Sequence, residues 1–141
     1  METVAQQRAG AQRSGTSPLY QVLAEDIVAM GVEAAFGLIS DDTALLATAL
    51  DTSGARFYGA RHENCAIAMA DGYAYAAGRL GVAVIGRGPA LANGLHGAIY
   101  ASRTGSPVLL IYGEAATVSQ PNGLLVEPQA VAHEEWMHIG P

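Results

Sequence analysis

The sequence predicts an α/β fold in which a doubly wound, mainly parallel sheet carries helices on both faces. Between residues 18 and 112, segments with helical periodicity alternate with short β-type runs. The runs at 82–85 and 108–112 are continuously apolar and do not alternate, which is typical of parallel strands covered on both sides. A glycine-rich turn follows the first of these runs, and we expect functional loops at the carboxyl ends of the strands.

The first predicted helix begins near Ser17 and Pro18, with serine as its N-cap and proline as its first helical residue. We expect it to end at Gly31, because glycine readily adopts the left-handed conformation that closes helices. Its apolar stripe, which we expect to be buried, consists of Leu19, Val22, Leu23, Ile27 and Met30.

A buried strand over residues 34–39 is expected next, followed by a second helix and a strand over residues 56–58. Asp41 or Asp42 is expected to cap the second helix, because short acidic side chains accept hydrogen bonds from the first free N–H groups of a helix. The apolar residues of this helix are Leu45, Leu46, Ala49 and Leu50.

The third predicted helix begins at Glu63, is built mostly of small residues and has Gly78 as its stop. Its apolar positions at helical spacing are Ala66, Ile67, Ala70, Tyr73, Ala74 and Ala77. A strand over residues 82–85, a helix over about 89–103 and a strand over 108–112 complete the expected fold. The last helix carries Leu91, Leu95, Ile99 and Ser102 on one side.

The composition excludes several classes of protein. A length of 141 residues fits one domain, and a net charge of −6 without clustered arginines excludes a nucleic-acid-binding surface. No apolar run approaches the roughly 20 residues of a membrane span. Cys65 is the single cysteine, which excludes an internal disulfide and favours the cytoplasm, and we expect it to be a small buried hydrophobe.

Two segments are expected to lie outside the folded domain. Residues 1–17 are polar, lack the apolar stretch of a signal peptide and predict a disordered tail. Residues 115–141 predict an irregular C-terminal extension. Its His133 and His138 would lie about 140° apart on a helix, so they do not form a metal-binding pair.

Glu63 lies in the first turn of the third helix, directly after His62. A carboxylate there is favoured by the exposed backbone N–H groups, by about 0.3–1 kcal/mol. One interpretation therefore makes Glu63 a helix-start residue, and the other makes it a functional acid.

A series of motifs resembles the N-terminal, pyrimidine-binding domain of thiamine diphosphate-dependent enzymes such as acetolactate synthases and 2-oxo acid decarboxylases. The series comprises RHE at 61–63 with MADGYAYAAG after it, FG at 36–37, GP at 88–89, Asn93 and SPVLLIYGE at the end. The resemblance implies that residues 18–114 form this domain. It also implies that Glu63 is catalytic and contacts the N1′ atom of the cofactor's aminopyrimidine, while Gly88, Pro89 and Asn93 bind the cofactor.

The chain departs from the family pattern in two loops. Arg87 and Ala90 replace small residues of the usual Ser-Gly-Pro-Gly turn, and LISDD at 38–42 replaces a common Pro-Gly pair. Arg87 either points at an anionic substrate or is a solvated surface arginine, and His62 either faces the cofactor or ends its loop. These departures leave the substrate class open.

The resemblance covers the pyrimidine half of the cofactor site and not the diphosphate half. The family holds the diphosphate through a metal bound by a Gly-Asp-Gly motif, whereas Asp71 follows alanine in mid-helix. The resemblance therefore implies no metal site here, with Mg²⁺ and the diphosphate held by a partner domain or subunit. The alanine-rich helix at 63–77 predicts a homo- or hetero-oligomer.

We therefore expect an incomplete lyase or transferase subunit or domain that acts, with thiamine diphosphate, on a 2-oxo acid or ketone by decarboxylation or carboligation. One alternative is a noncatalytic α/β assembly module that kept the fold. A third hypothesis is an unrelated flavodoxin-like ligand-binding domain.

Overall fold

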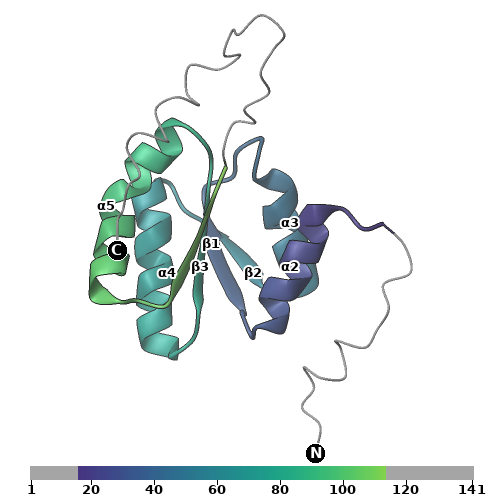
Figure 1. Ribbon diagram of the computed structural model, residues 1–141, viewed down its shortest axis with the longest axis horizontal. Helices are drawn as coiled ribbons and strands as arrows, with labels where there is room; N and C mark the ends of the chain where they lie inside the picture. The colour runs from purple at the N-terminus through teal and green to yellow at the C-terminus, as the bar shows by residue number, and fades with distance from the viewer. Residues whose placement is uncertain (1–15, 114–141) are drawn as a thin grey trace, which may run out of the picture.

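A parallel sheet with strand order β2-β1-β3-β4 organises the computed structural model, which describes residues 16–113. The strands are β1 (Ala34–Gly37), β2 (Arg56–Gly59), β3 (Gly81–Ile85) and β4 (Val108–Tyr112). Helices α4 (Glu63–Ala77) and α5 (Pro89–Thr104) cover one face, and α2 (Leu19–Ala29) and α3 (Ala44–Ser53) cover the other (Figure 1). The predicted doubly wound α/β fold is confirmed.

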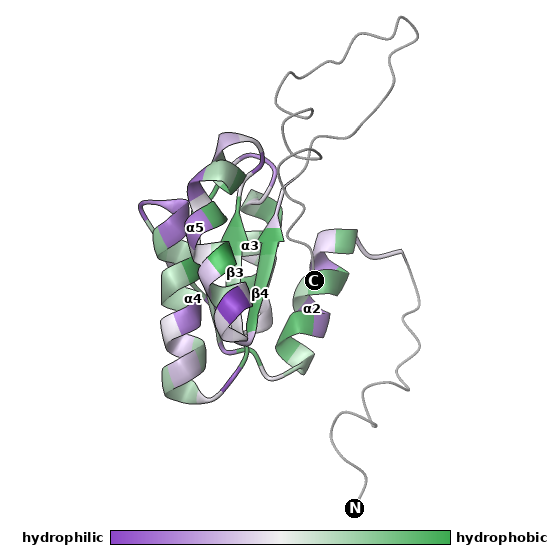
Figure 2. Ribbon diagram, turned by 60° about the vertical axis from the view of Figure 1, so that its left-hand side comes forward, coloured by the Kyte–Doolittle hydropathy of each residue, from purple (hydrophilic) through white to green (hydrophobic). Residues whose placement is uncertain are grey.

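The sheet separates two hydrophobic cores. Successive residues of a strand point to opposite faces, so Ala35 and Val82 pack toward α2 and α3 whereas Phe36 and Ala83 pack toward α4 and α5. Both β1 and β3 are buried along their whole length, as the continuous apolar runs predict for central parallel strands. Figure 2 shows β3 and β4 as strongly hydrophobic strands beside α5.

The predicted stop of α4 is correct, since Gly78 follows it with a φ of 62°. Helix α5 ends at Thr104, one residue beyond the expected end, and Gly105 follows with a φ of 66°. Helix α2 ends at Ala29, two residues before the predicted Gly31, which has a φ of 88°. The predicted start of the first helix is wrong by one residue. Pro18 is the N-cap itself, with a ψ of 142°, and its carbonyl oxygen accepts hydrogen bonds from the backbone N–H groups of Gln21 and Val22.

The predicted buried stripes are partly wrong. In the stripe predicted for α2, Leu19 is 80% exposed, Leu23 is also exposed, and Met30, the C-cap, is 60% exposed. The buried residues of α2 are Ala24 and Ile27. On α5, Leu91 is buried as expected, but Ile99 and Ser102 are exposed and their places are taken by Gly94, Ala98 and Ala101. Small residues are buried there because α5 packs close to α4. Two other residues at apolar helical positions, Leu45 of α3 and Ala77 of α4, are also exposed.

Asp41 and Asp42 do not cap α3, which has Thr43 as its N-cap and no capping hydrogen bond from a side chain. Cys65 is exposed on α4, so its predicted burial is wrong. Strand β1 is two residues shorter than the predicted 34–39.

At the amino ends of the strands, the side chain of Glu33 forms an ion pair with Arg79. The hydrogen bond within this pair is the larger cause, and the negative charge of Glu33 the smaller one, of a raised pKa of Arg79. None of the helices between residues 16 and 113 is long and apolar enough to cross a membrane. The predicted tail lies almost wholly outside the described residues, and the predicted extension with His133 and His138 lies wholly outside them.

Candidate functional site

The candidate site lies where β1 and β3 run side by side and end at the same edge of the sheet. The chain leaves β1 toward α3 on one face and leaves β3 toward α5 on the other. Adjacent parallel strands whose connections diverge in this way open a crevice at their carboxyl ends, and this is where open α/β sheets bind ligands.

A cavity of about 220 Å³ occupies this crevice. Its wall is formed by the loop after β1, the loop after β3 and the start of α4, and comprises Leu38, Ile39, Ser40, Asp41, Asp42, Glu63, Gly86, Arg87 and Ala90. Two of the predicted site residues, Glu63 and Arg87, therefore line one cavity. A larger hollow of about 590 Å³ between α2 and α3 contains none of the predicted site residues.

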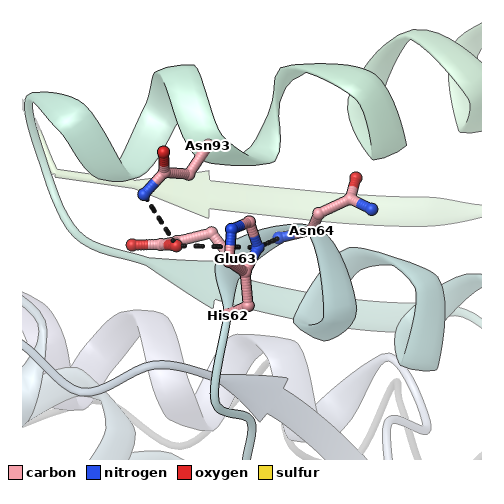
Figure 3. A network of polar contacts seen from close by, with 4 residues as sticks. All are labelled: His62, Glu63, Asn64 and Asn93. Carbon is pink, nitrogen blue, oxygen red and sulfur yellow. Dashed lines mark hydrogen bonds and ion pairs between the residues drawn. The ribbon is translucent and has the colours of Figure 1, made fainter.

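Glu63 is a buried carboxylic acid at the first position of α4. Its side chain is only 9% exposed, and its Oε2 atom accepts a hydrogen bond of 3.1 Å from Asn93 Nδ2 on α5. Figure 3 shows dashed lines from Oε2 to Asn93 and His62, while the other carboxylate oxygen carries no such line and points away from His62. Burying a carboxyl group is costly unless hydrogen bonds or a shared proton compensate. Glu63 is therefore more than a solvated first-turn acid.

His62 has a defined structural task at the start of α4. It is the N-cap in extended conformation, and its Nδ1 atom accepts a hydrogen bond of 3.2 Å from the backbone N–H of Asn64. Because Nδ1 is the acceptor, a neutral His62 carries its proton on Nε2. The same Nδ1 atom lies 4.0 Å from Glu63 Oε2, and half of the His62 side chain is exposed. His62 therefore flanks Glu63 and also fixes the helix start.

Gly88 and Pro89 shape the loop between β3 and α5. Gly88 is the N-cap of α5 with a φ of 66° and a ψ of −126°, a conformation that favours glycine, and Pro89 occupies the first helical turn. Arg87 lies just before them, half-buried, and its backbone N–H donates a hydrogen bond of 3.1 Å to Asp42 Oδ2.

Two glycines bring α5 close enough to α4 for Asn93 to reach Glu63. A Cβ atom added at Gly94 would lie 2.9 Å from Ile67 Cδ1, and one added at Gly97 would lie 2.8 Å from Asn64 Oδ1. A larger residue at Gly94 would have to displace the ends of the Ile67 and Ile85 side chains, and one at Gly97 would also press on Ile67 Cβ at 3.1 Å. The hydrogen bond between Asn93 and Glu63 thus depends on a glycine-lined helix contact.

Sequence reasoning missed two residues near the site. Asn64 has a buried side-chain oxygen for which the described part of the chain supplies no hydrogen-bond partner. Asp42 was expected as a helix cap but contacts the loop after β3, and no local sequence signal indicates this distant partner. Within residues 16–113, no group of three or more histidine, cysteine, aspartate or glutamate side chains could hold a metal ion.

Comparison with known proteins gives consistent matches over this region. Residues 18–137 match the family described as "Thiamine pyrophosphate enzyme, N-terminal TPP binding domain". The chain is 36% identical over 103 residues to 2-hydroxyacyl-CoA lyase 2 of Danio rerio, an alignment that covers 73% of this chain and 17% of the relative.

Two further relatives have other names. The acetolactate synthase large subunit of Buchnera aphidicola is 30% identical over 98 residues, with 69% of this chain and 17% of the relative covered. The sulfoacetaldehyde acetyltransferase of Alcaligenes xylosoxydans is 32% identical over 103 residues, with 73% and 17% covered. The chain therefore spans about a sixth of the length of these curated relatives.

Proposed function

This chain belongs to the thiamine pyrophosphate enzymes, as a member of their N-terminal TPP binding domain family, and on that premise we propose that its cavity beside Glu63 binds the pyrimidine half of thiamine diphosphate. The observation that carries the proposal is the buried Glu63 carboxylate at the edge of the sheet where β1 and β3 end. Family membership excludes the hypothesis of an unrelated flavodoxin-like domain.

The residues around the cavity fit an aminopyrimidine ring. One oxygen of Glu63 accepts a hydrogen bond from Asn93, and the other, which carries no dashed line in Figure 3, can share a proton with a ring nitrogen. Gly86 forms part of the cavity wall and has no side chain to fill the cavity. Leu38 and Ala90 supply apolar contacts to its faces.

When bound, the cofactor supplies an electron sink for making or breaking a bond next to a carbonyl group. Glu63 would share a proton with the pyrimidine N1′ atom of the bound cofactor. Asn93 orients the carboxylate by donating to Oε2, so that the other oxygen faces the ring. Gly88 and Pro89 do not line the cavity themselves, but they set the start of α5 beside Arg87 and Ala90, which do and which would contact the bound cofactor.

The reaction class is proposed from the relatives' names. They include a lyase of 2-hydroxyacyl-CoA, an acetolactate synthase and a sulfoacetaldehyde acetyltransferase. We infer that this chain serves a lyase or transferase whose substrate is a 2-oxo acid or related ketone, by decarboxylation or carboligation. Arg87, at the cavity wall, is the candidate for contact with an anionic substrate, and His62 is the second candidate.

The diphosphate and Mg²⁺ are proposed to be held by a separate domain or subunit, since the relatives are about six times as long as the matched segment. The exposed side of α4 is a candidate surface for this partner or for a second copy. Its exposed residues are uncharged: Cys65, Ala68, Met69, Gly72, Tyr75, Ala76 and Ala77. The half-buried Asp71 lies between Ala68 and Tyr75 by helical spacing. The same surface supports the alternative of a noncatalytic assembly module. The cytoplasm stays the predicted compartment.

Glu63→Gln in the complete enzyme tests the proposed catalytic role of Glu63 against the alternative of a noncatalytic assembly module. The amide keeps the shape of the side chain but cannot exchange a proton with N1′, so deuterium exchange at the cofactor's C2 atom should slow by about 10²–10⁴-fold. The melting temperature should stay close to that of the wild type. Asp71→Asn is the matched control, because it removes a carboxylate from the middle of the same helix. Equal exchange rates in wild type and Glu63→Gln would leave Glu63 a helix-start residue.

A further inference from the structure

Asp42 contacts the ends of three strands. It belongs to the loop after β1, where its Oδ1 atom accepts a hydrogen bond of 2.5 Å from Ser40 Oγ. Its Oδ2 atom accepts a hydrogen bond of 3.1 Å from the backbone N–H of Arg87, which follows β3. These two residues are 45 positions apart in the sequence, so the carboxylate bridges the two loops that form opposite walls of the cavity.

The residue that follows β4 lies next to the same carboxylate. Gly113 follows β4 directly, and its backbone N–H donates a hydrogen bond of 3.2 Å to the carbonyl oxygen of Ile85. A Cβ atom on Gly113 would overlap the Asp42 carboxylate and would lie 3.2 Å from the Arg87 nitrogen. The space that Asp42 occupies therefore exists because residue 113 is glycine.

We propose that Asp42 is a positioning residue: its carboxylate joins the ends of β1, β3 and β4 and sets the distance between the two loops of the cofactor cavity. Arg87 and Gly88 are adjacent, so fixing the Arg87 backbone also fixes the residue whose positive φ begins α5. A carboxylate suits this task because its two oxygens accept from two loops at once, and charged acceptors form stronger hydrogen bonds than neutral ones. The link to the cofactor rests on the proposed function, whereas the link between the loops does not.

Amide hydrogen exchange in the 141-residue chain tests the link between the loops without any cofactor. Asp42→Ala should speed exchange at the Arg87 amide about 10-fold or more, because that N–H loses its charged acceptor. Asp42→Asn should stay near wild type, since its oxygen still accepts from Arg87 and its NH₂ group donates to the Ser40 hydroxyl. Asp41→Ala is the control, because it removes the same charge from the same exposed loop. Unchanged exchange at Arg87 in Asp42→Ala overturns the proposal.

A substitution at Gly113 should also disrupt the hydrogen bond between Asp42 and Arg87. Gly113→Ala should displace the carboxylate and speed exchange at Arg87, whereas Gly59→Ala, at the end of β2, should not, because an added Cβ there meets nothing within 4 Å. In the Asp42→Ala background, Gly113→Ala should have a smaller effect than in the wild type, because only the 3.2 Å approach to the Arg87 nitrogen remains once the carboxylate is gone. Equal effects of Gly113→Ala in both backgrounds would overturn the three-strand contact.

The role in the site is tested in the complete enzyme. Asp42→Ala should weaken thiamine diphosphate binding about 10-fold while leaving the melting temperature nearly unchanged, and Asp42→Asn should restore the affinity. Faster exchange at Arg87 with unaltered affinity overturns the positioning role. If Glu63→Gln leaves exchange at the cofactor's C2 atom unchanged, the proposed function fails, but the Arg87 amide result still decides whether Asp42 joins the loops.

Discussion

Replacing Gly97 by alanine should push α4 and α5 apart, whereas the same change at Gly72 should stabilise the chain. A Cβ atom at residue 97 would lie 2.8 Å from Asn64 Oδ1 and 3.1 Å from both Cβ and Cγ2 of Ile67. Ile67 is only 1% exposed and is branched at Cβ, so these atoms cannot swing away. At Gly72, on the exposed side of α4, an added Cβ would meet nothing within 4 Å.

The comparison isolates the cost of the helix contact. Both glycines lie inside helices, so each alanine gains about 1 kcal/mol of helix propensity. Gly97→Ala also carries an overpacking cost of about 1–3 kcal/mol. The free energy of unfolding of Gly72→Ala should therefore be about 1–3 kcal/mol higher than that of Gly97→Ala. For a folded region of this size, this difference corresponds to about 5–20 °C in Tm.

Urea denaturation followed by circular dichroism measures this difference in the 141-residue chain. The protein should be dilute, so that association through the exposed side of α4 does not add to the stability of one variant. If Gly97→Ala proves as stable as Gly72→Ala, the close contact between α4 and α5 is refuted, and with it the packing that brings Asn93 to Glu63.

Two other predictions concern assembly. The chain should associate through the exposed side of α4, so Tyr75→Glu should weaken association at least about 10-fold in sedimentation. Alkylation of Cys65 should also slow as the wild-type protein is concentrated. A wild-type monomer at micromolar concentration with unchanged alkylation contradicts this prediction. The isolated chain should bind thiamine diphosphate more weakly than micromolar even with Mg²⁺, because the charge-assisted contacts to the diphosphate lie on the proposed partner; micromolar or tighter binding by calorimetry rules this out.

The sequence predicts the order of the elements correctly because local signals carry it. Gly78 closes its helix as expected, since a left-handed cap depends on a single residue. The stripes of α2 and α5 are partly wrong because burial depends on the neighbouring helix as well as on periodicity. On α5 the neighbour lies so close that Gly94 and Ala98 are buried in place of Ile99.

The site shows the same distinction. The position of Glu63 at a helix start follows from the adjacent turn, and the resemblance to a family draws attention to it. The role of Asp42 does not follow, because an acidic residue before a helix looks like a cap while its partners lie at Arg87 and Gly113. Such long-range contacts need the assembled sheet before they can be recognised.

The division of the core by the sheet has a consequence for how this protein can change over generations. Glu63 and Asn93 stand on the helices of one face, and the core beneath them includes Ala34 and Phe36 but not Ala35. Substitutions in α2 and α3 can therefore change the thermal stability of the protein while Glu63 and Asn93 keep their spacing. Replacements in the core beneath α4 and α5 would change that spacing. We therefore expect natural variants to differ far more on the face covered by α2 and α3 than on the face covered by α4 and α5.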